Sequence, residues 1–188
     1  ANDLARRAVA GPSDAVLETA AGSGVVTRAL APLLQQEADY VVSDLNPPRL
    51  ERAQSQQNPD ARITWQAADA LDLPFEDDCF DVVLCQFGAM FFPDKAKGFS
   101  EARRVLKRGG RFLFNVWDKI EENEFADVVV NAASELFFDD PPRFLARTPH
   151  GYGDPDQVLH DLGAAGFDLV DVHTITAESR AETPKIPA

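Results

Sequence analysis

The chain has 188 residues, a formal net charge of −13, a hydrophobic content of 45% and a charged content of 26%. This length and composition are typical of a single globular domain with a sizeable core, so we treat residues 1–188 as one domain. The acidic balance disfavours a nucleic-acid binder, because such proteins usually carry basic patches. With no apolar run of about 20 residues and no signal-peptide pattern, the sequence predicts a cytoplasmic protein without a membrane span.

The cysteines and histidines predict neither a disulfide nor a metal site. Cys79 and Cys85 would lie roughly 20 Å apart in an extended segment, whereas a disulfide tolerates about 7 Å between backbones. They are therefore interpreted as thiols of a reducing compartment. His150, His160 and His173 share no metal-binding spacing with each other or with the cysteines.

The first third of the chain predicts a helix, a strand, a glycine turn and a second helix. Residues 2–9 have the spacing of an amphipathic helix, and residues 15–18 form a short apolar run. Gly22 and Gly24 follow, and a helix is expected from Val25 to about Gln36. Glycines at the mouth of a helix let a ligand approach the backbone closely.

The glycine turn by itself leaves the ligand open. Glu18 closes the first strand where a ligand would sit, outside the carboxyl end of a parallel strand. A dinucleotide fingerprint, G-x-G-x-x-G/A, needs a small third residue to pack helix on strand. Thr27 stands in that place, so the match to a nicotinamide site is incomplete.

A second acidic residue follows the next predicted strand. Residues 39–43 are apolar and end at Asp44, about twenty residues after the glycine turn. Such a carboxylate can accept both hydroxyls of a ribose, or it can cap the following helix. Because Asn46 before Pro47 is already a good cap, Asp44 is left for the ribose. A polar helix is expected over residues 49–57.

The middle of the chain contains two further β-rich runs. Residues 62–66 are followed by Asp69, which either caps a short turn or binds a ligand. Residues 80–87 are continuously apolar, as expected of a strand buried on both faces of a parallel sheet. Residues 88–92 then predict an apolar loop at the carboxyl end of that strand.

Five β-rich runs alternating with helices predict an α/β fold. A helix over residues 93–106 ends at Gly109-Gly110, and residues 111–117 form the fifth run. Right-handed crossovers between such runs give a doubly wound, mostly parallel sheet in a three-layer α-β-α arrangement.

The last third predicts an insertion, a helix and an edge strand. Residues 118–153 are expected to face the substrate, with a helix over residues 124–138 and a candidate lid over residues 139–153. A capped helix is expected over residues 154–165, and the alternation of residues 167–176 predicts an exposed or edge strand.

Four stretches carry a family resemblance: ETAAGSG, SDLN, AADALDLPFEDDCFDVVLCQFGAMFFPD and EARRVLKRGGRFLFNVW. They resemble the class I S-adenosylmethionine (SAM)-dependent methyltransferases, in the broad group that includes quinone-biosynthesis methyltransferases. The resemblance covers about residues 15–117 and, weakly, residues 154–176. It implies SAM as cofactor and S-adenosylhomocysteine (SAH) as product. The usual first motif is E/D-x-G-x-G-x-G, and Ala20 stands here where the first glycine is expected.

The resemblance also implies which residues bind the cofactor. The methionine and ribose end would be lined by Glu18, Ala20, Gly22 and Gly24, the ribose hydroxyls held by Asp44, the adenine contacted by Leu45, Asp69 and Ala70, and the methionine flanked by Gln86 and Phe87.

The acceptor is expected to be a small molecule with an apolar or aromatic body. Met90 and Phe91 suggest this, although an aromatic cluster is more often core. His150 and Tyr152 fall in the candidate lid and could touch the substrate, but a surface histidine and a packing tyrosine are the commoner readings. Methyl transfer needs mainly alignment, so no catalytic base is named.

Two other functions stay open at this point. A nicotinamide-dependent oxidoreductase is disfavoured by Thr27 and by the motif around residues 80–87. A methyltransferase-like domain without catalysis is kept because the family continues into a further antiparallel strand and nothing after Ile175 supplies one. We therefore expect either that the chain is incomplete at that end or that the strand comes from elsewhere, and self-association is left open.

Overall fold

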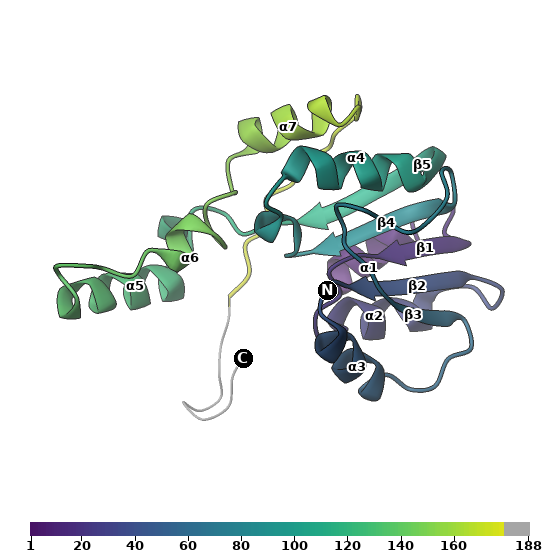
Figure 1. The fold of residues 1–188 in the computed structure, drawn as a ribbon, viewed down its shortest axis with the longest axis horizontal. Coiled ribbons are helices and arrows are strands. Elements are labelled where there is room, and N and C mark those ends of the chain that lie inside the picture. Colours follow the sequence, from purple (N-terminus) through teal and green to yellow (C-terminus); the bar gives the residue numbers. More distant parts are fainter. Residues whose placement is uncertain (179–188) are drawn as a thin grey trace.

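A five-stranded parallel sheet forms the centre of the computed structural model, which describes residues 1–178 (Figure 1). Its strands are β1 (Ala15–Glu18), β2 (Asp39–Asp44), β3 (Ile63–Ala67), β4 (Phe80–Gln86) and β5 (Leu106–Asn115). They are arranged in the order β3-β2-β1-β4-β5, and every pair is parallel. The predicted doubly wound α/β sheet is confirmed.

Helices cover both faces of this sheet. One face carries α1 (Asn2–Ala8), α2 (Val25–Leu30) with the 3-10 turn η1 (Ala31–Leu33), and α3 (Pro47–Ser55), whereas the other carries α4 (Lys95–Val105) and α7 (Pro155–Ala164). Neighbouring strand residues point to opposite layers: Val82 and Leu84 pack under the first group, and Val83 and Cys85 face the second. The three-layer arrangement follows from this alternation.

The strand order reverses direction at β1. From there the chain proceeds outward to β2 and β3, then returns to β4 on the other side of β1 and continues to β5. The amide of Thr19 donates to the carbonyl of Leu84 at 2.8 Å, which holds the carboxyl ends of β1 and β4 together. Ligands of open parallel sheets bind at such a switch point, outside the carboxyl ends of the strands.

An arginine holds the connection between β3 and β4, which contains no helix. Arg104 of α4 donates to the carbonyls of Leu73 and Phe75 and to the carboxylates of Asp77 and Glu101. Glu101 in turn accepts the amide of Leu73 at 2.8 Å. The loop is therefore tied to α4 by charge-assisted bonds.

Two predicted boundaries at the C-terminal side are corrected. The alternating residues 167–176 form no strand, so the predicted edge strand is wrong. Leu169 is 96% exposed, and no backbone pairing joins this segment to β5. An alternating sequence forms a strand only where a neighbouring backbone pairs with it. The fifth strand begins at Leu106 rather than Arg111, because Leu106 pairs with Phe80 before a bulge at Gly109.

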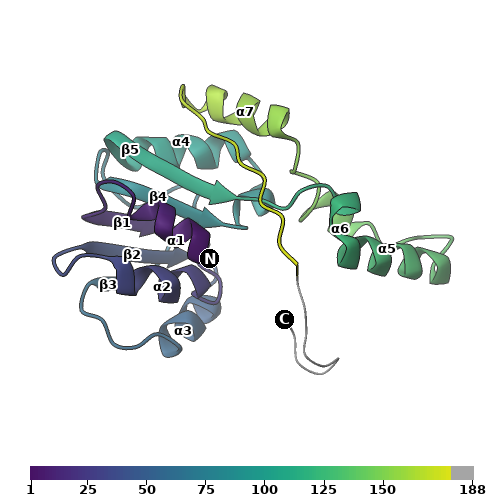
Figure 2. The same cartoon turned by 180° about the vertical axis from the view of Figure 1, so that it is seen from behind.

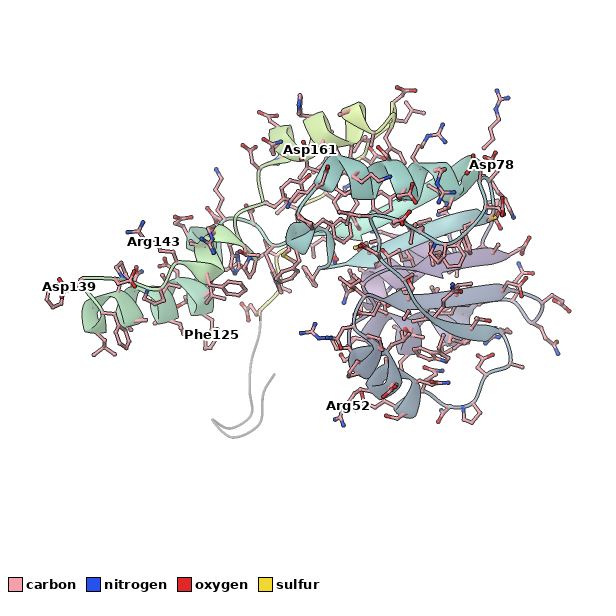
Figure 3. The ribbon with its side chains drawn as sticks, in the orientation of Figure 1. Arg52, Asp78, Phe125, Asp139, Arg143 and Asp161 are labelled. Atoms are coloured by element: carbon pink, nitrogen blue, oxygen red, sulfur yellow. The ribbon has the colours of Figure 1, made fainter. Side chains whose placement is uncertain are left out.

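The insertion after β5 stands beyond the carboxyl ends of β4 and β5 (Figures 1 and 2). It contains η3 (Ile120–Glu122), α5 (Glu124–Leu136) and α6 (Phe144–Arg147), and η2 (Ala89–Phe91) lies earlier, after β4. No residue of α5 is buried, and Phe125 is 85% exposed (Figure 3). Within residues 1–178 no helix is long and apolar enough to cross a bilayer.

Arg104→Lys is expected to lower the free energy of unfolding by about 2 kcal/mol, because an ammonium cannot reach both loop carbonyls and both carboxylates at once. Urea denaturation measures the effect. Arg103→Lys, at the exposed neighbouring position, is the matched control and should change stability little. Equal stabilities of the two variants would show that the Arg104 bonds do not hold the loop.

Candidate functional site

The turn between β1 and α2 adopts left-handed backbone conformations at three positions. Ala20, Gly22 and Gly24 have φ of 52°, 57° and 73°. Glycine tolerates this region without cost, whereas a residue with a Cβ is strained there by roughly 1–2 kcal/mol. Ala20 occupies the position at which the family pattern has glycine, so the left-handed backbone explains why that pattern prefers glycine. Strain kept at such a turn points to function.

Glu18 lies beneath this turn and is almost fully buried. Its Oε2 accepts hydrogen bonds from the Thr27 hydroxyl at 2.7 Å and from the Tyr40 hydroxyl. The Ser43 hydroxyl donates to the backbone carbonyl of Glu18 at 3.0 Å. Burial raises the pKa of Glu18 from 4.5 to about 7, against the lowering effect of the two hydroxyl donors. The carboxyl group therefore joins β1, α2 and β2 from below the turn.

Asp44 connects the end of β2 to the glycine turn. Its Oδ2 accepts the amide of Gly22 and its Oδ1 accepts the amide of Asn46, both at 2.8 Å. Asn46 caps α3 by accepting the amide of Arg49 at 3.1 Å, in agreement with the assignment of the cap to Asn46. Each oxygen of an ionised carboxylate has a further lone pair, so Asp44 can hold the turn and still accept a diol.

The end of β4 approaches the turn from the other side. The Gln86 side-chain oxygen, Oε1, is buried and has no hydrogen-bond partner within residues 1–178, which is uncommon for a native polar atom. Phe87 has φ of 51°. A Cβ built on Gly88 would lie 2.5 Å from the Cβ of Ala20, so the two loops are in direct contact.

The remaining predicted cofactor residues lie at the surface beyond β2 and β3. Leu45 is 70% exposed and Asp69 is also exposed. Asp69 Oδ1 accepts the amide of Leu71 at 2.9 Å, so Asp69 does cap its turn, while no described residue bonds to its Oδ2. Ala70 is half-buried beside it.

The carboxyl edge of the sheet thus offers groups suited to an adenosyl cofactor. A carboxylate can accept a ribose diol, the left-handed turn allows close backbone approach, and the Gln86 amide oxygen lacks a donor. A cavity of about 360 Å³ beside the turn is lined by Gly22, Ser23, Pro48, Arg49 and Arg52. The residues present fit SAM.

Two of the four predicted substrate residues are packing residues. Met90 is 3% exposed and Tyr152 is 5% exposed. The Tyr152 hydroxyl donates to Asp161 of α7 at 2.8 Å, and the Lys95 ammonium lies 4.7 Å from the Tyr152 ring centroid. Burial raises the pKa of Tyr152, and the bond to Asp161 adds to this effect. Tyr152 therefore joins α4 to α7 and is not placed to act as a base.

The other two substrate candidates reach the surface. Phe91 is 52% exposed, and His150 is half-buried with its Nδ1 2.9 Å from the backbone carbonyl oxygen of Asp118. These positions leave Phe91 and His150 available to a bound acceptor.

Trp117 is a candidate site residue that the sequence did not indicate. Its ring stacks on Phe87 with centroids 4.2 Å apart and planes 9° apart. Asn115, two residues earlier, accepts the amide of Phe87 through its backbone oxygen at 3.1 Å and its side-chain oxygen at 3.2 Å. The available signal was a polar and an aromatic residue directly after the apolar part of the last strand.

No group of three or more potential metal ligands gathers anywhere in residues 1–178.

Comparison with known proteins identifies the family to which the chain is similar. The family described as "Methyltransferase domain" matches residues 17–114. A demethylmenaquinone methyltransferase of Clavibacter sepedonicus is 30% identical over 177 residues, covering 86% of this chain and 69% of the relative. A ubiquinone/menaquinone biosynthesis C-methyltransferase of Serratia proteamaculans is 28% identical over 173 residues, with the same coverage of 86% and 69%. A candidate methyltransferase of Bacillus halodurans of known structure is 30% identical, covers 91% of this chain and 70% of its own, and superposes with a TM-score of 0.68.

The raised pKa of Glu18 makes a pH dependence of stability testable. Because the folded pKa of about 7 exceeds the ordinary 4.5, the carboxyl group's contribution to stability is complete below pH 4.5 and is lost as pH rises through 7. The loss is on the order of 3 kcal/mol. The difference in unfolding free energy between Glu18→Gln and the unmodified chain should therefore change by this amount between pH 4.5 and 7.5.

Urea denaturation at several pH values measures this difference, and Glu37→Gln, at an exposed acid, is the control. A difference that stays constant with pH would show that Glu18 is ionised throughout.

Proposed function

The chain belongs to the class I SAM-dependent methyltransferases, and we propose that its acceptor is a small molecule with a planar aromatic or quinone-like body. As a member of this family it is an enzyme that uses SAM as cofactor and transfers the methyl group to a small-molecule acceptor. The finer identity of the acceptor, and the residues that bind cofactor and acceptor, are the proposal.

The cofactor site is argued from the two hydrogen bonds that the Asp44 carboxylate accepts from the amides of Gly22 and Asn46. It holds the carboxylate at the point where β1 and β2 end together, with one lone pair on each oxygen to spare. We assign the ribose hydroxyls to Asp44 and the methionine end to the turn at Ala20, Gly22 and Gly24. Leu45, Asp69 and Ala70 are assigned to the adenine, and Gln86 and Phe87 to the methionine.

Glu18 receives a different role from the one that the resemblance implied. Its side chain is 1% exposed and is bonded to Thr27 and Tyr40. We propose that it sets the position of the turn from beneath and does not itself cover the methionine.

SAM supplies an activated methyl group when bound, so the chain's own task is alignment and exclusion of water. Well-oriented reacting groups lower a barrier by about 7–11 kcal/mol without a covalent intermediate. The buried loop around Met90 gives the rigid wall that such alignment needs. Phe91 and Trp117 offer apolar contact at the mouth, being 52% and 42% exposed. The names of the quinone-biosynthesis relatives support an acceptor of this chemistry.

The nicotinamide alternative is disfavoured by the structure of the turn. Thr27 stands where a dinucleotide site needs a small residue. It is fully buried, and its hydroxyl donates a hydrogen bond to Glu18. The non-catalytic domain that the sequence left open is not favoured either, because the chain belongs to a family of enzymes.

The proposal also covers location and partners. We expect the reaction to take place in the cytoplasm, which the free thiols of Cys79 and Cys85 support, and we expect no nucleic-acid partner given the net charge of −13. Self-association is left to direct measurement.

Calorimetric titration with SAH is expected to show micromolar affinity that Asp44→Ala lowers by at least about tenfold, because two charge-assisted bonds to the ribose and the anchor of Gly22 are lost. Asp39→Ala, at the exposed start of the same strand, is the control and should leave affinity unchanged. NAD is titrated in parallel and should not bind. Binding of NAD in place of SAH would overturn the cofactor assignment, and SAH binding that survives in Asp44→Ala would remove Asp44 from the site.

A further inference from the structure

The rings of Phe87, Trp117 and His150 form a series beyond the carboxyl ends of β4 and β5. Trp117 stacks on Phe87, and the His150 ring lies 6.1 Å from Trp117, tilted by 37°. Trp117 keeps 42% of its surface exposed although one face is covered by Phe87. An exposed indole held at the carboxyl edge of the sheet is a typical surface for stacking a flat ring.

We propose that Trp117 and His150 form the acceptor-binding pair: the exposed indole surface of Trp117 stacks on a planar hydroxyaromatic ring, and His150 Nε2 accepts a hydrogen bond from its hydroxyl. This inference rests on the proposed function, since it names the acceptor class of that same site. It assigns a role to Trp117, which no motif indicated, and a specific atom of His150.

The platform is rigid because backbone bonds hold both of its layers. Phe87 adopts a left-handed conformation, and its amide is held by both oxygens of Asn115. On the other side, a Cβ built on Gly153 would lie 2.8 Å from the carbonyl oxygen of Trp117, so the returning chain packs directly on the Trp117 backbone. Little entropy remains to be lost when a ring stacks on such a surface.

The tautomer of His150 follows from its partner. The Nδ1 atom lies 2.9 Å from the backbone carbonyl oxygen of Asp118, and a carbonyl oxygen can only accept. The proton of the neutral imidazole is therefore on Nδ1, and Nε2 carries the lone pair. No described residue bonds to Nε2, so it is available to a hydroxyl donor.

Phe87 connects the pair to the cofactor turn, because it stacks on Trp117 and directly precedes Gly88. Gly88, which follows Phe87, is packed against Ala20 so closely that an added Cβ would overlap its side chain. Because Phe87 and Gly88 join Trp117 to the loop assigned to the methionine end, we place the acceptor on the Trp117 side of that loop. Tyr152, the other candidate near His150, is engaged with Asp161 and contributes only packing.

Calorimetric titration of the SAH-saturated chain with 1-naphthol tests the platform. Trp117→Ala should lower the affinity roughly tenfold, the upper range for an aromatic stacking pair. Trp117→Phe should recover most of it, and Trp65→Phe, the other tryptophan of the chain, should have no effect. Decahydro-1-naphthol, which has the same hydroxyl on a non-planar ring, should bind weakly to all variants.

The role of Nε2 is tested with a second pair of ligands. His150→Asn keeps a donor for the Asp118 carbonyl but lacks the distal acceptor, so it should weaken 1-naphthol about three- to tenfold. It should leave the weaker binding of 1-methoxynaphthalene unchanged, because that ring has no hydroxyl to donate. Nitrogen-15 NMR of the imidazole should show the proton of neutral His150 on Nδ1, with His150→Asn used to assign the resonance.

Unchanged 1-naphthol affinity in Trp117→Ala would overturn the platform, provided that this variant still binds SAH and unfolds at the same temperature. Equal losses for both ligands in His150→Asn, or a proton on Nε2, would overturn the hydrogen bond. Failure of the unmodified chain to bind SAH would instead contradict the proposed function, and 1-naphthol is then titrated alone to test the pair separately.

Discussion

The buried carboxyl group of Glu18 is the interaction on which the ligand edge of this protein depends. It ends β1, takes the hydroxyl of Thr27 from α2 and the hydroxyl of Tyr40 from β2, and so joins three elements at one point. Burying a carboxyl group is costly unless its oxygens are bonded, which explains why two donors meet there. The turn above Glu18 has left-handed conformations at Ala20, Gly22 and Gly24. These residues have small side chains or none, so the elements joined at Glu18 support the turn from below.

At the opposite edge of the sheet, where the strands begin, arginine side chains bind the backbone carbonyls of the connections. Arg104 ties the loop after β3 to α4, and Arg62 donates to three carbonyls at the end of α2 and η1. Arg111 does the same for the end of α1. Each guanidinium offers five donors in a fixed plane, so one side chain can satisfy several orphan carbonyls at once. The ends of α1 and η1 and the loop after β3 are thereby bonded to the neighbouring elements.

The acceptor side is built differently from the cofactor side. Around Asp44 the groups are polar and held by backbone amides, whereas beyond β4 and β5 they are aromatic rings in contact, with Phe87 belonging to both. This division fits the proposed acceptor, a flat apolar molecule, beside a charged, hydroxyl-rich cofactor. No residue of helix α5 is buried, and its expected position facing the substrate stays a prediction.

The sequence by itself determined the parallel sheet, the helix order and the two acidic positions, because hydrophobic periodicity and turn residues act over a few neighbours in the chain. It could not decide that residues 167–176 remain unpaired or that the Glu18 side chain turns inward. Nor could it decide that the Tyr152 hydroxyl donates to Asp161, because each of these depends on a partner in another element. Trp117 shows this most clearly. Its stacking on Phe87 exists only once β4 and β5 lie side by side, so only the tertiary structure makes Trp117 a candidate for the site.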